Sequence, residues 1–212
     1  EDELAVLIDN LTTNETYFFR ESAQLRAFSE EILPELREAN VSRRRLRIWS
    51  AGCSTGEEPY TIAILLLESG EWWRDWQVEI LGSDISQRVL HTARRGVYKI
   101  GSHRATPPDM LGKYFLDEGR GDYRVADSVR KLVSFSYVNL LDAGKSSLIR
   151  DMDVIFCRNV IIYFDREAKK KVIGSFYDKL RESGYLLLGH AESLINISTA
   201  FALRTLRNDM VY

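Results

Sequence analysis

The stretch LRIWSAGCSTGEEPY, residues 46–60, decides how this chain is interpreted. Apolar and β-branched residues at its start predict a short strand over residues 46–50. A run of small residues follows, and Glu57, Glu58 and Pro59 then open a segment of helical character. Glycines between a buried strand and a helix start let the backbone approach a ligand closely, with free N–H groups directed at it. The stretch therefore predicts one wall of a nucleotide-type pocket.

The composition is that of an ordinary globular chain, since 45% of the 212 residues are hydrophobic and 28% are charged. This length can bury one core with a small appendage. The formal net charge of −2 gives no reason to expect nucleic acid, and the basic cluster at residues 43–47 is interpreted as a solvated edge before a strand. No apolar run is as long as a membrane span. We therefore expect neither nucleic-acid binding nor insertion into a membrane.

The number and positions of the cysteines indicate the cellular compartment. Cys53 and Cys157 are the only cysteines, and their positions fit neither a disulfide framework nor a zinc site. No signal peptide is recognisable at the start of the sequence. We therefore expect a cytoplasmic protein without a bound metal.

Strand-like and helix-like segments alternate along most of the chain. The predicted strands cover residues 46–50, 78–83, 131–138, 153–157 and 185–189, and the predicted helices cover residues 59–69, 86–95 and 168–181. Such alternation predicts an α/β fold with a mostly parallel sheet and helices on both faces. Ligands bind such sheets beyond the carboxyl ends of the strands, where the glycine loop and Asp84 would then be neighbours. Gly184 is expected to end the last helix.

The remaining segments lie outside the alternating strands and helices. Residues 1–40 predict a helical lead-in, with Pro34 near a helix start. Prolines and glycines interrupt residues 101–127, which predicts a short helical and hairpin insertion. Residues 201–206 and 209–212 are expected to form a closing antiparallel pair.

The glycine loop differs from a dinucleotide-binding fingerprint, which requires G-x-G-x-x-G. Ser54 occupies its middle, and the two glutamates that follow would repel a pyrophosphate on the helix end. A ligand with an ammonium group and no phosphate is favoured there. S-adenosylmethionine is such a ligand, and Asp84 at the next strand end would supply the carboxylate for its ribose.

The same loop also reads G-x-S-x-G, the nucleophile elbow of α/β-hydrolases. Ser54, Asp153 and His190 occur in the order of such a triad. Against this alternative, Ser54 follows the first predicted strand where the elbow normally follows the fifth, and Asp153 begins a strand. A structural role is preferred for His190.

Six segments, in this order, resemble the CheR-type chemotaxis receptor methyltransferases. They are LTTNETYFFRE (11–21), WSAGCSTGEEPY (49–60), GSDI (82–85), VNLL (138–141), IFCRNVIIYF (155–164) and GHAES (189–193). The resemblance spans nearly the whole chain and implies the Rossmann-like fold of class I S-adenosylmethionine-dependent methyltransferases, with a small antiparallel β-subdomain inserted at about 114–135. It also implies that residues 1–40 are the remnant of a linker from a missing N-terminal helical domain and contribute to the cofactor site. Residues 41–212 would be the catalytic domain.

The resemblance implies a bacterial enzyme that transfers a methyl group from S-adenosylmethionine to glutamate side chains in the cytoplasmic helical region of chemoreceptors. The products would be glutamyl methyl esters and S-adenosylhomocysteine. The residues that it assigns to the cofactor are Asn14, Thr16, Arg20, Gly52, Glu57, Asp84, Asn139, Leu140, Arg158 and Asn159. A catalytically inactive S-adenosylmethionine-binding module is the further alternative.

Individual roles follow from the same resemblance. Arg20 would pair with the methionine carboxylate, Glu57 would take the amino group, and Asp84 would hold the ribose hydroxyls. Asn139 and Leu140 would contact the adenine. Arg158 and Asn159 would form the pocket floor near the methyl group, where Arg158 could position the acceptor.

Each of these side chains also has a structural interpretation. Asn14, Thr16 and Asp84 could cap helices, Glu57 could favour a helix N-terminus, Arg20 could be a solvated charge, and Asn139 and Asn159 could be turn residues. Tyr163 and Phe164 are interpreted as core. A glutamate acceptor with a pKa of about 4.3 is already ionised at neutral pH, so no catalytic base is expected.

Receptor recognition is the last expectation. In the family that the chain resembles, the β-subdomain can bind a C-terminal tether peptide of the receptor by strand addition. The segment DEGRGDYR, residues 117–124, looks shorter than the corresponding loop of tether-dependent members. We expect an enzyme that is associated with receptor arrays and independent of the tether.

Overall fold

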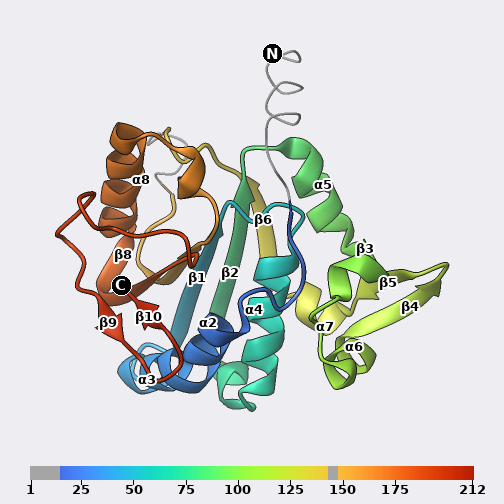
Figure 1. Cartoon of the computed structure of the whole chain (residues 1–212). Helices are drawn as coiled ribbons and strands as arrows, with labels where there is room; N and C mark the ends of the chain where they lie inside the picture. Colours follow the sequence, from blue (N-terminus) through green and yellow to red (C-terminus); the bar gives the residue numbers. More distant parts are fainter. Residues whose placement is uncertain (1–14, 143–147) are drawn as a thin grey trace.

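The computed structural model describes residues 15–142 and 148–212. Its centre is a five-stranded parallel sheet with the strand order β6-β2-β1-β7-β8 (Figure 1). The strands are β1 (Arg45–Ala51), β2 (Gln77–Asp84), β6 (Val133–Tyr137), β7 (Met152–Cys157) and β8 (Leu180–Leu188). The parallel sheet expected from the alternating sequence pattern is confirmed.

Helices cover both faces of the sheet, because successive side chains of a buried strand point to opposite sides. On one face, Ile48 and Phe156 belong to a core that also contains residues of the lead-in helices and α4. On the other face, Trp49 and Ile155 pack with Phe176 of α8. The helices concerned are α2 (Ser22–Ala27), the π-helical turn η1 (Phe28–Ile32), α3 (Leu33–Ala39), α4 (Glu57–Glu68) and α8 (Arg166–Lys179).

The helical lead-in belongs to the body of the fold. Phe18, Phe28 and Ile32 are fully buried. Pro34 lies in the first turn of α3, as predicted. Residues 1–14, which include the predicted cofactor residue Asn14, lie outside the described residues.

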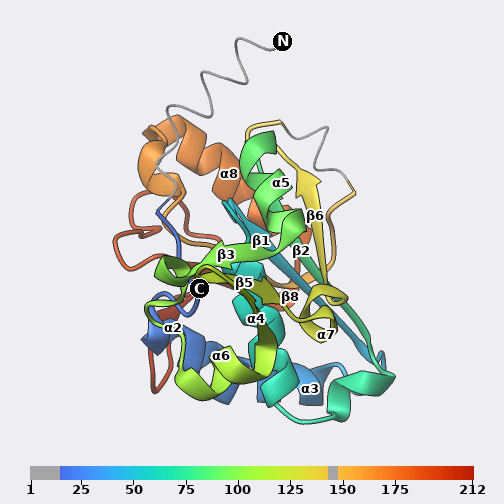
Figure 2. The ribbon, with the colours of Figure 1, turned by 90° about the vertical axis from the view of Figure 1, so that its right-hand side faces the viewer.

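A small antiparallel sheet with the strand order β3-β5-β4 lies beside the large sheet (Figures 1 and 2). Its strands are β3 (Val97–Lys99), β4 (Phe115–Gly119) and β5 (Asp122–Val125), and η3 (Ile100–His103) and α6 (Pro108–Tyr114) contact it. Helix α5 (Gln87–Arg95) packs against β2 and β6 of the large sheet, and α7 (Asp127–Arg130) packs against α4 and β6. Phe18 joins this sheet to the main core, with ring centroids 4.9 Å from Tyr98 and 4.8 Å from Phe115.

The limits of this small sheet differ from the expected insertion at 114–135. The sheet begins at Val97, and Val133–Tyr137 is the edge strand of the large sheet. A strand of three residues such as β3 is too short to show a period in the sequence.

The transition from α8 to β8 also differs from the prediction. The strand begins directly after the helix, so Gly184 lies inside β8 and does not end the helix. Pairing between β7 and β8 is irregular between Met152 and Val154. A Cβ atom on Gly184 would lie 3.0 Å from the carbonyl oxygen of Arg181, so the glycine fits this irregularity.

The C-terminal segment covers the edge strand β8. The predicted antiparallel pair is present as β9 (Arg204–Thr205) and β10 (Met210–Val211). Tyr212 exchanges two backbone hydrogen bonds with Leu186, at 2.7 and 3.0 Å. Two short 3-10 turns complete the fold, η2 (Trp72–Asp75) and η4 (Ile161–Tyr163). Within residues 15–142 and 148–212, no helix combines the length and the apolar character needed to cross a membrane.

Candidate functional site

A cavity of about 410 Å³ lies at the carboxyl ends of the parallel strands. Its size falls in the range of small-molecule sites, and its position is where α/β sheets bind ligands. It is lined by Glu15, Thr16, Tyr17, Arg20, Gly52, Cys53, Ser54, Glu58, Asp84, Ile85, Val138, Asn139, Leu140, Leu141, Arg158, Asn159, Val160, Tyr163 and Phe164. The structure therefore brings together eight of the ten residues named from the sequence.

The glycine loop after β1 forms one wall of the cavity. The backbone N–H groups of Gly52 and Cys53 both donate to the carbonyl oxygen of Ser83, each at 2.8 Å. Gly52 has a φ of 79°, and a Cβ atom there would lie 2.5 Å from a methyl group of Val160. Glycine is required at this position because the loops after β1 and β7 touch.

Asp84 connects the glycine loop to the start of α5. Its carboxylate accepts the backbone N–H of Ser54 at 2.9 Å and that of Ser86 at 3.0 Å. Ser86 caps α5 through its own hydroxyl. The carboxylate thus lies at the cavity, as predicted, and also orders two strand-end loops.

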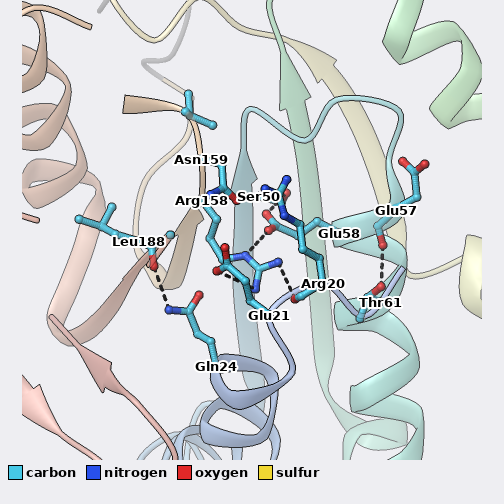
Figure 3. Close-up of polar contacts among 12 residues, drawn as sticks. Arg20, Glu21, Gln24, Ser50, Glu57, Glu58, Thr61, Arg158, Asn159 and Leu188 are labelled. Atoms are coloured by element: carbon cyan, nitrogen blue, oxygen red, sulfur yellow. Dashed lines mark hydrogen bonds and ion pairs between the residues drawn. The ribbon is translucent and has the colours of Figure 1, made fainter. Parts of the chain in front are cut away.

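The two glutamates that open α4 have different surroundings. Glu57 is 2% exposed and accepts hydrogen bonds from the hydroxyls of Thr55 at 2.6 Å and Ser102 at 3.3 Å. Its burial raises the pKa of this carboxyl group. Figure 3 shows Glu57 pointing away from the group formed by Glu58, Arg158 and Arg20. The structure therefore does not place Glu57 in the cavity, contrary to the sequence-based expectation.

Glu58 lines the cavity in place of Glu57. Its carboxylate accepts the hydroxyl of Ser50 and the Nε–H of Arg158, both at 2.7 Å. Neighbouring residues of a helix point about 100° apart, so only one of the two can face the ligand. The sequence contains both glutamates but no signal that fixes the rotation of the helix.

Arg158 is buried behind the cavity floor, with 7% of its surface exposed. Besides the Nε bond to Glu58, its Nη2 donates to the carbonyl oxygen of Arg20 at 3.0 Å. Its Nη1 lies 3.9 Å from the Glu21 carboxylate and has no hydrogen-bond partner among the described residues (Figure 3). An unpaired N–H on a buried cation is costly, and the ion pair with Glu21 offsets part of this cost.

Thr16 and Arg20 of the helical lead-in line the cavity. The Nη1 of Arg20 donates to the carbonyl oxygen of Glu15 at 2.7 Å, and its guanidinium carbon lies 5.8 Å from the centre of the Tyr17 ring. The lead-in is also anchored to the end of β8, because Gln24 donates to the carbonyl oxygen of Leu188 at 2.9 Å.

The loops after β6 and β7 supply the rest of the lining. The Asn139 side chain accepts the backbone N–H of Leu141 at 3.0 Å, which shapes its turn. Asn159 has a φ of 60° and lies at the cavity floor. Tyr163 is 61% exposed at the cavity and not part of the core, which corrects the sequence-based interpretation.

The hydrolase alternative has no assembled triad. Asp153 is the second residue of β7, at the opposite end of the sheet from Ser54, and its carboxylate accepts hydrogen bonds from Arg47, Asn40 and Arg43. The Nε2 of His190 lies 3.6 Å from Asp209. The G-x-S-x-G spacing therefore reflects the loop geometry and not a nucleophile elbow.

The donor set of the cavity fits S-adenosylmethionine. Glu58 and Asp84 supply carboxylates for an amino group and for ribose hydroxyls, and Arg20 and Arg158 supply N–H groups for a carboxylate. A flat apolar base would find apolar neighbours in Ile85, Val138, Leu140, Leu141, Val160 and Phe164.

Comparison with known proteins agrees with this geometry. Residues 14–209 match the family model described as "CheR methyltransferase, SAM binding domain". "Chemotaxis protein methyltransferase 2" of Vibrio cholerae is 39% identical over 211 residues, covering 100% of this chain and 73% of the relative. "Chemotaxis protein methyltransferase" of Borreliella burgdorferi is 42% identical over 195 residues, covering 91% of this chain and 69% of the relative. This chain belongs to the CheR methyltransferase family and comprises its S-adenosylmethionine-binding domain.

Proposed function

We propose that the chain is a protein-glutamate O-methyltransferase that modifies chemotaxis receptors. The curated relatives, which are named chemotaxis protein methyltransferases, support methylation in chemotaxis. The observation that carries the proposal is the cavity at the strand ends, where three carboxylates, those of Glu15, Glu58 and Asp84, and two guanidinium groups surround an apolar space. The acceptor is a glutamate side chain in the cytoplasmic helical region of a receptor, and the product is a glutamyl methyl ester.

The roles of the cofactor residues are part of this proposal. Asp84 binds the ribose hydroxyls, and Arg20 pairs with the methionine carboxylate. Glu58 takes the amino group in place of Glu57, because Glu58 faces the cavity and Glu57 does not. Leu140 and Asn139 contact the adenine.

The chemistry requires positioning more than proton transfer. Bound S-adenosylmethionine supplies a methyl group on a positively charged sulfur. The acceptor carboxylate, already ionised at neutral pH, forms the new oxygen–carbon bond while the carbon–sulfur bond breaks and sulfur keeps the electron pair. Arg158 attracts the incoming carboxylate, while its ion pair with Glu58 at 2.7 Å limits how strongly it holds the nucleophile. The protein's contribution is alignment and exclusion of water.

A labelling experiment tests the reaction. The chain is incubated with S-adenosylmethionine labelled in its methyl group and with the cytoplasmic fragment of a receptor. We expect label on receptor glutamates that is released as volatile methanol in base, since carboxyl esters are hydrolysed by hydroxide. A fragment with glutamine at the labelled positions is the matched control. Tight S-adenosylhomocysteine binding without any label on receptors would favour the inactive binding module.

Independence from a tether peptide is a further part of the proposal. Strands β4 and β5 are joined by a tight turn in which Arg120 and Gly121 both have positive φ, 55° and 76°. Such a two-residue connection leaves little loop with which to grip a peptide. Calorimetry with the receptor's C-terminal peptide should show no binding, and micromolar affinity would refute tether independence.

The domain organisation and location follow the same proposal. Residues 1–40 are a linker from an N-terminal helical domain and complete the cofactor site, and residues 41–212 form the catalytic domain. The burial of Phe18 and Phe28 in the main core supports this role of the lead-in. We place the enzyme in the cytoplasm at receptor arrays, because its acceptor glutamates lie there.

A further inference from the structure

Glu192, in the turn after β8, receives an unusual number of backbone hydrogen bonds. One carboxylate oxygen accepts the N–H groups of Asn159 at 2.8 Å and Gly189 at 2.7 Å. The other accepts those of Val160 at 2.9 Å and Ile162 at 3.2 Å. Hydrogen bonds to an ionised acceptor are about twice as strong as neutral ones. Glu192 therefore ties the loop after β7 to the loop after β8.

The loop that Glu192 holds, residues 158–164, is the floor of the cavity. Arg158, Asn159 and Val160 all line the cavity, as do Tyr163 and Phe164. Glu192 itself does not line it. A change at Glu192 would therefore reach a ligand only through this loop.

The loop conformation directs several backbone N–H groups at one carboxylate. Asn159 has a φ of 60°, a left-handed conformation that asparagine tolerates better than most residues other than glycine. The N–H groups of Asn159, Val160 and Ile162 converge on one side and form a concave anion-binding surface. In this chain the anion is the Glu192 carboxylate.

Close packing at Gly189 shows that the two loops fit each other. A Cβ atom on Gly189 would lie 2.8 Å from the backbone nitrogen of Asn159 and 2.9 Å from the Glu192 carboxylate. Neither neighbour can yield without breaking the hydrogen bonds described above. Burial raises the pKa of Glu192, and the backbone N–H groups oppose that rise.

We propose that Glu192 is a positioning residue for methyl transfer. Its carboxylate fixes residues 158–164 in the conformation that presents Arg158 and the cavity floor to the cofactor and the acceptor, without contacting either. This inference rests on the proposed function for the identity of the acceptor. Its effect on cofactor binding can be measured independently of that acceptor.

The test uses Glu192→Gln, which keeps the side-chain size but turns an NH₂ group toward two N–H donors. We expect the affinity for S-adenosylhomocysteine, measured by calorimetry per folded molecule, to fall at least about tenfold, as expected when one charge-assisted tie is lost. Amide hydrogen exchange of Asn159, Val160 and Ile162 should accelerate while that of β7 stays slow.

The matched control is Asp153→Asn, which alters a buried carboxylate at the other end of β7 and should lower stability without changing the affinity. If both variants lose stability but neither changes the affinity, Glu192 is merely structural and the proposal is overturned.

If Glu192→Gln does not fold, Gly189→Ala tests the proposal instead, because its methyl group displaces the loop while the Glu192 side chain is retained. Unchanged affinity for S-adenosylhomocysteine in this variant would also overturn the proposal. Wild type that binds the cofactor but labels no receptor would refute the proposed function, and the affinity comparison would still decide the role of Glu192.

Discussion

The two ends of strand β7 hold charged groups in different ways. At its start, the Asp153 carboxylate is 3% exposed and accepts bonds from the Arg47 backbone N–H at 2.8 Å, the Asn40 side chain at 3.0 Å and Arg43 at 3.1 Å. At its end, the Nη1 of Arg158 and one oxygen of Glu21 are buried 3.9 Å apart, and neither has a hydrogen-bond partner among the described residues. Within residues 15–142 and 148–212, both oxygens of Asp153 accept hydrogen bonds, whereas the Nη1 of Arg158 and one oxygen of Glu21 have none.

This difference indicates where the fold needs stability and where it needs a ligand. Buried polar groups are almost always paired, and of the unpaired buried atoms among the described residues only the Nη1 of Arg158 belongs to a residue that lines the cavity. The closed end is covered by the segment that follows α3, which contributes Asn40 and Arg43. The open end is where strand-end loops diverge around the cavity. The following predictions test this contrast, beginning with the largest effect.

Asp84→Ala should have the largest effect on the open end. It removes the acceptor of the Ser54 and Ser86 backbone N–H groups together with the proposed ribose ligand. We expect the affinity for S-adenosylhomocysteine to fall about 100-fold, the equivalent of two charge-assisted hydrogen bonds. Calorimetry measures this affinity, and unimpaired binding would show that Asp84 is not a cofactor ligand.

Asp153→Asn should affect the closed end alone. Replacing this buried carboxylate weakens its ion pair with Arg43 and should lower the free energy of unfolding by about 2 kcal/mol. Urea unfolding measures the loss. The affinity of the folded protein for cofactor should change by less than about twofold, and a larger change would show that the two ends are coupled.

Glu58→Gln should lower cofactor affinity about tenfold, because one charge-assisted bond is lost at the cavity. The variant weakens the contact between Glu58 and Arg158, which is 2.7 Å in the wild type. Glu57→Gln, one residue earlier, is the matched control. Equal losses of affinity in the two variants would contradict the orientation of α4.

Glu57→Gln should have the smallest effect on binding, with a change in affinity below about twofold, because Glu57 does not line the cavity. The substitution should instead change how the stability of the protein depends on pH. Burial raises the pKa of Glu57 above its ordinary 4.5, so the folded protein holds this proton more tightly than the unfolded chain. The wild type should therefore lose stability relative to the variant as the pH rises above 4.5. Melting curves at several pH values check this, and parallel pH profiles would contradict it.

The sequence predicted the parallel sheet because its strands are short apolar runs that end at small or polar residues. Strand β7 is buried at all its positions, and such a run between breaking residues is recognisable without a structure. The site residue Asp84 follows from the same reasoning, because it ends β2, whereas Arg158 was assigned to the site only through the family resemblance.

The features that the sequence could not predict depend on how a helix is rotated against the sheet and on contacts between segments that are distant in the sequence. The choice between Glu57 and Glu58 is set by the rotation of α4 against the sheet. Gly184 resembles a helix stop, but its position follows from the pairing of β8 with β7. Glu192 is 32 or 33 residues from Val160 and Asn159, which it binds, so no local pattern connects them.

A crystal structure of the chain with S-adenosylhomocysteine tests the contrast between the two ends most directly. The ligand should occupy the cavity at the strand ends, with its ribose on Asp84, its amino group on Glu58 and its carboxylate on Arg20. The network around Asp153 should be unchanged. A ligand bound elsewhere, or in the cavity without contact to Asp84 and Glu58, would contradict the proposed site.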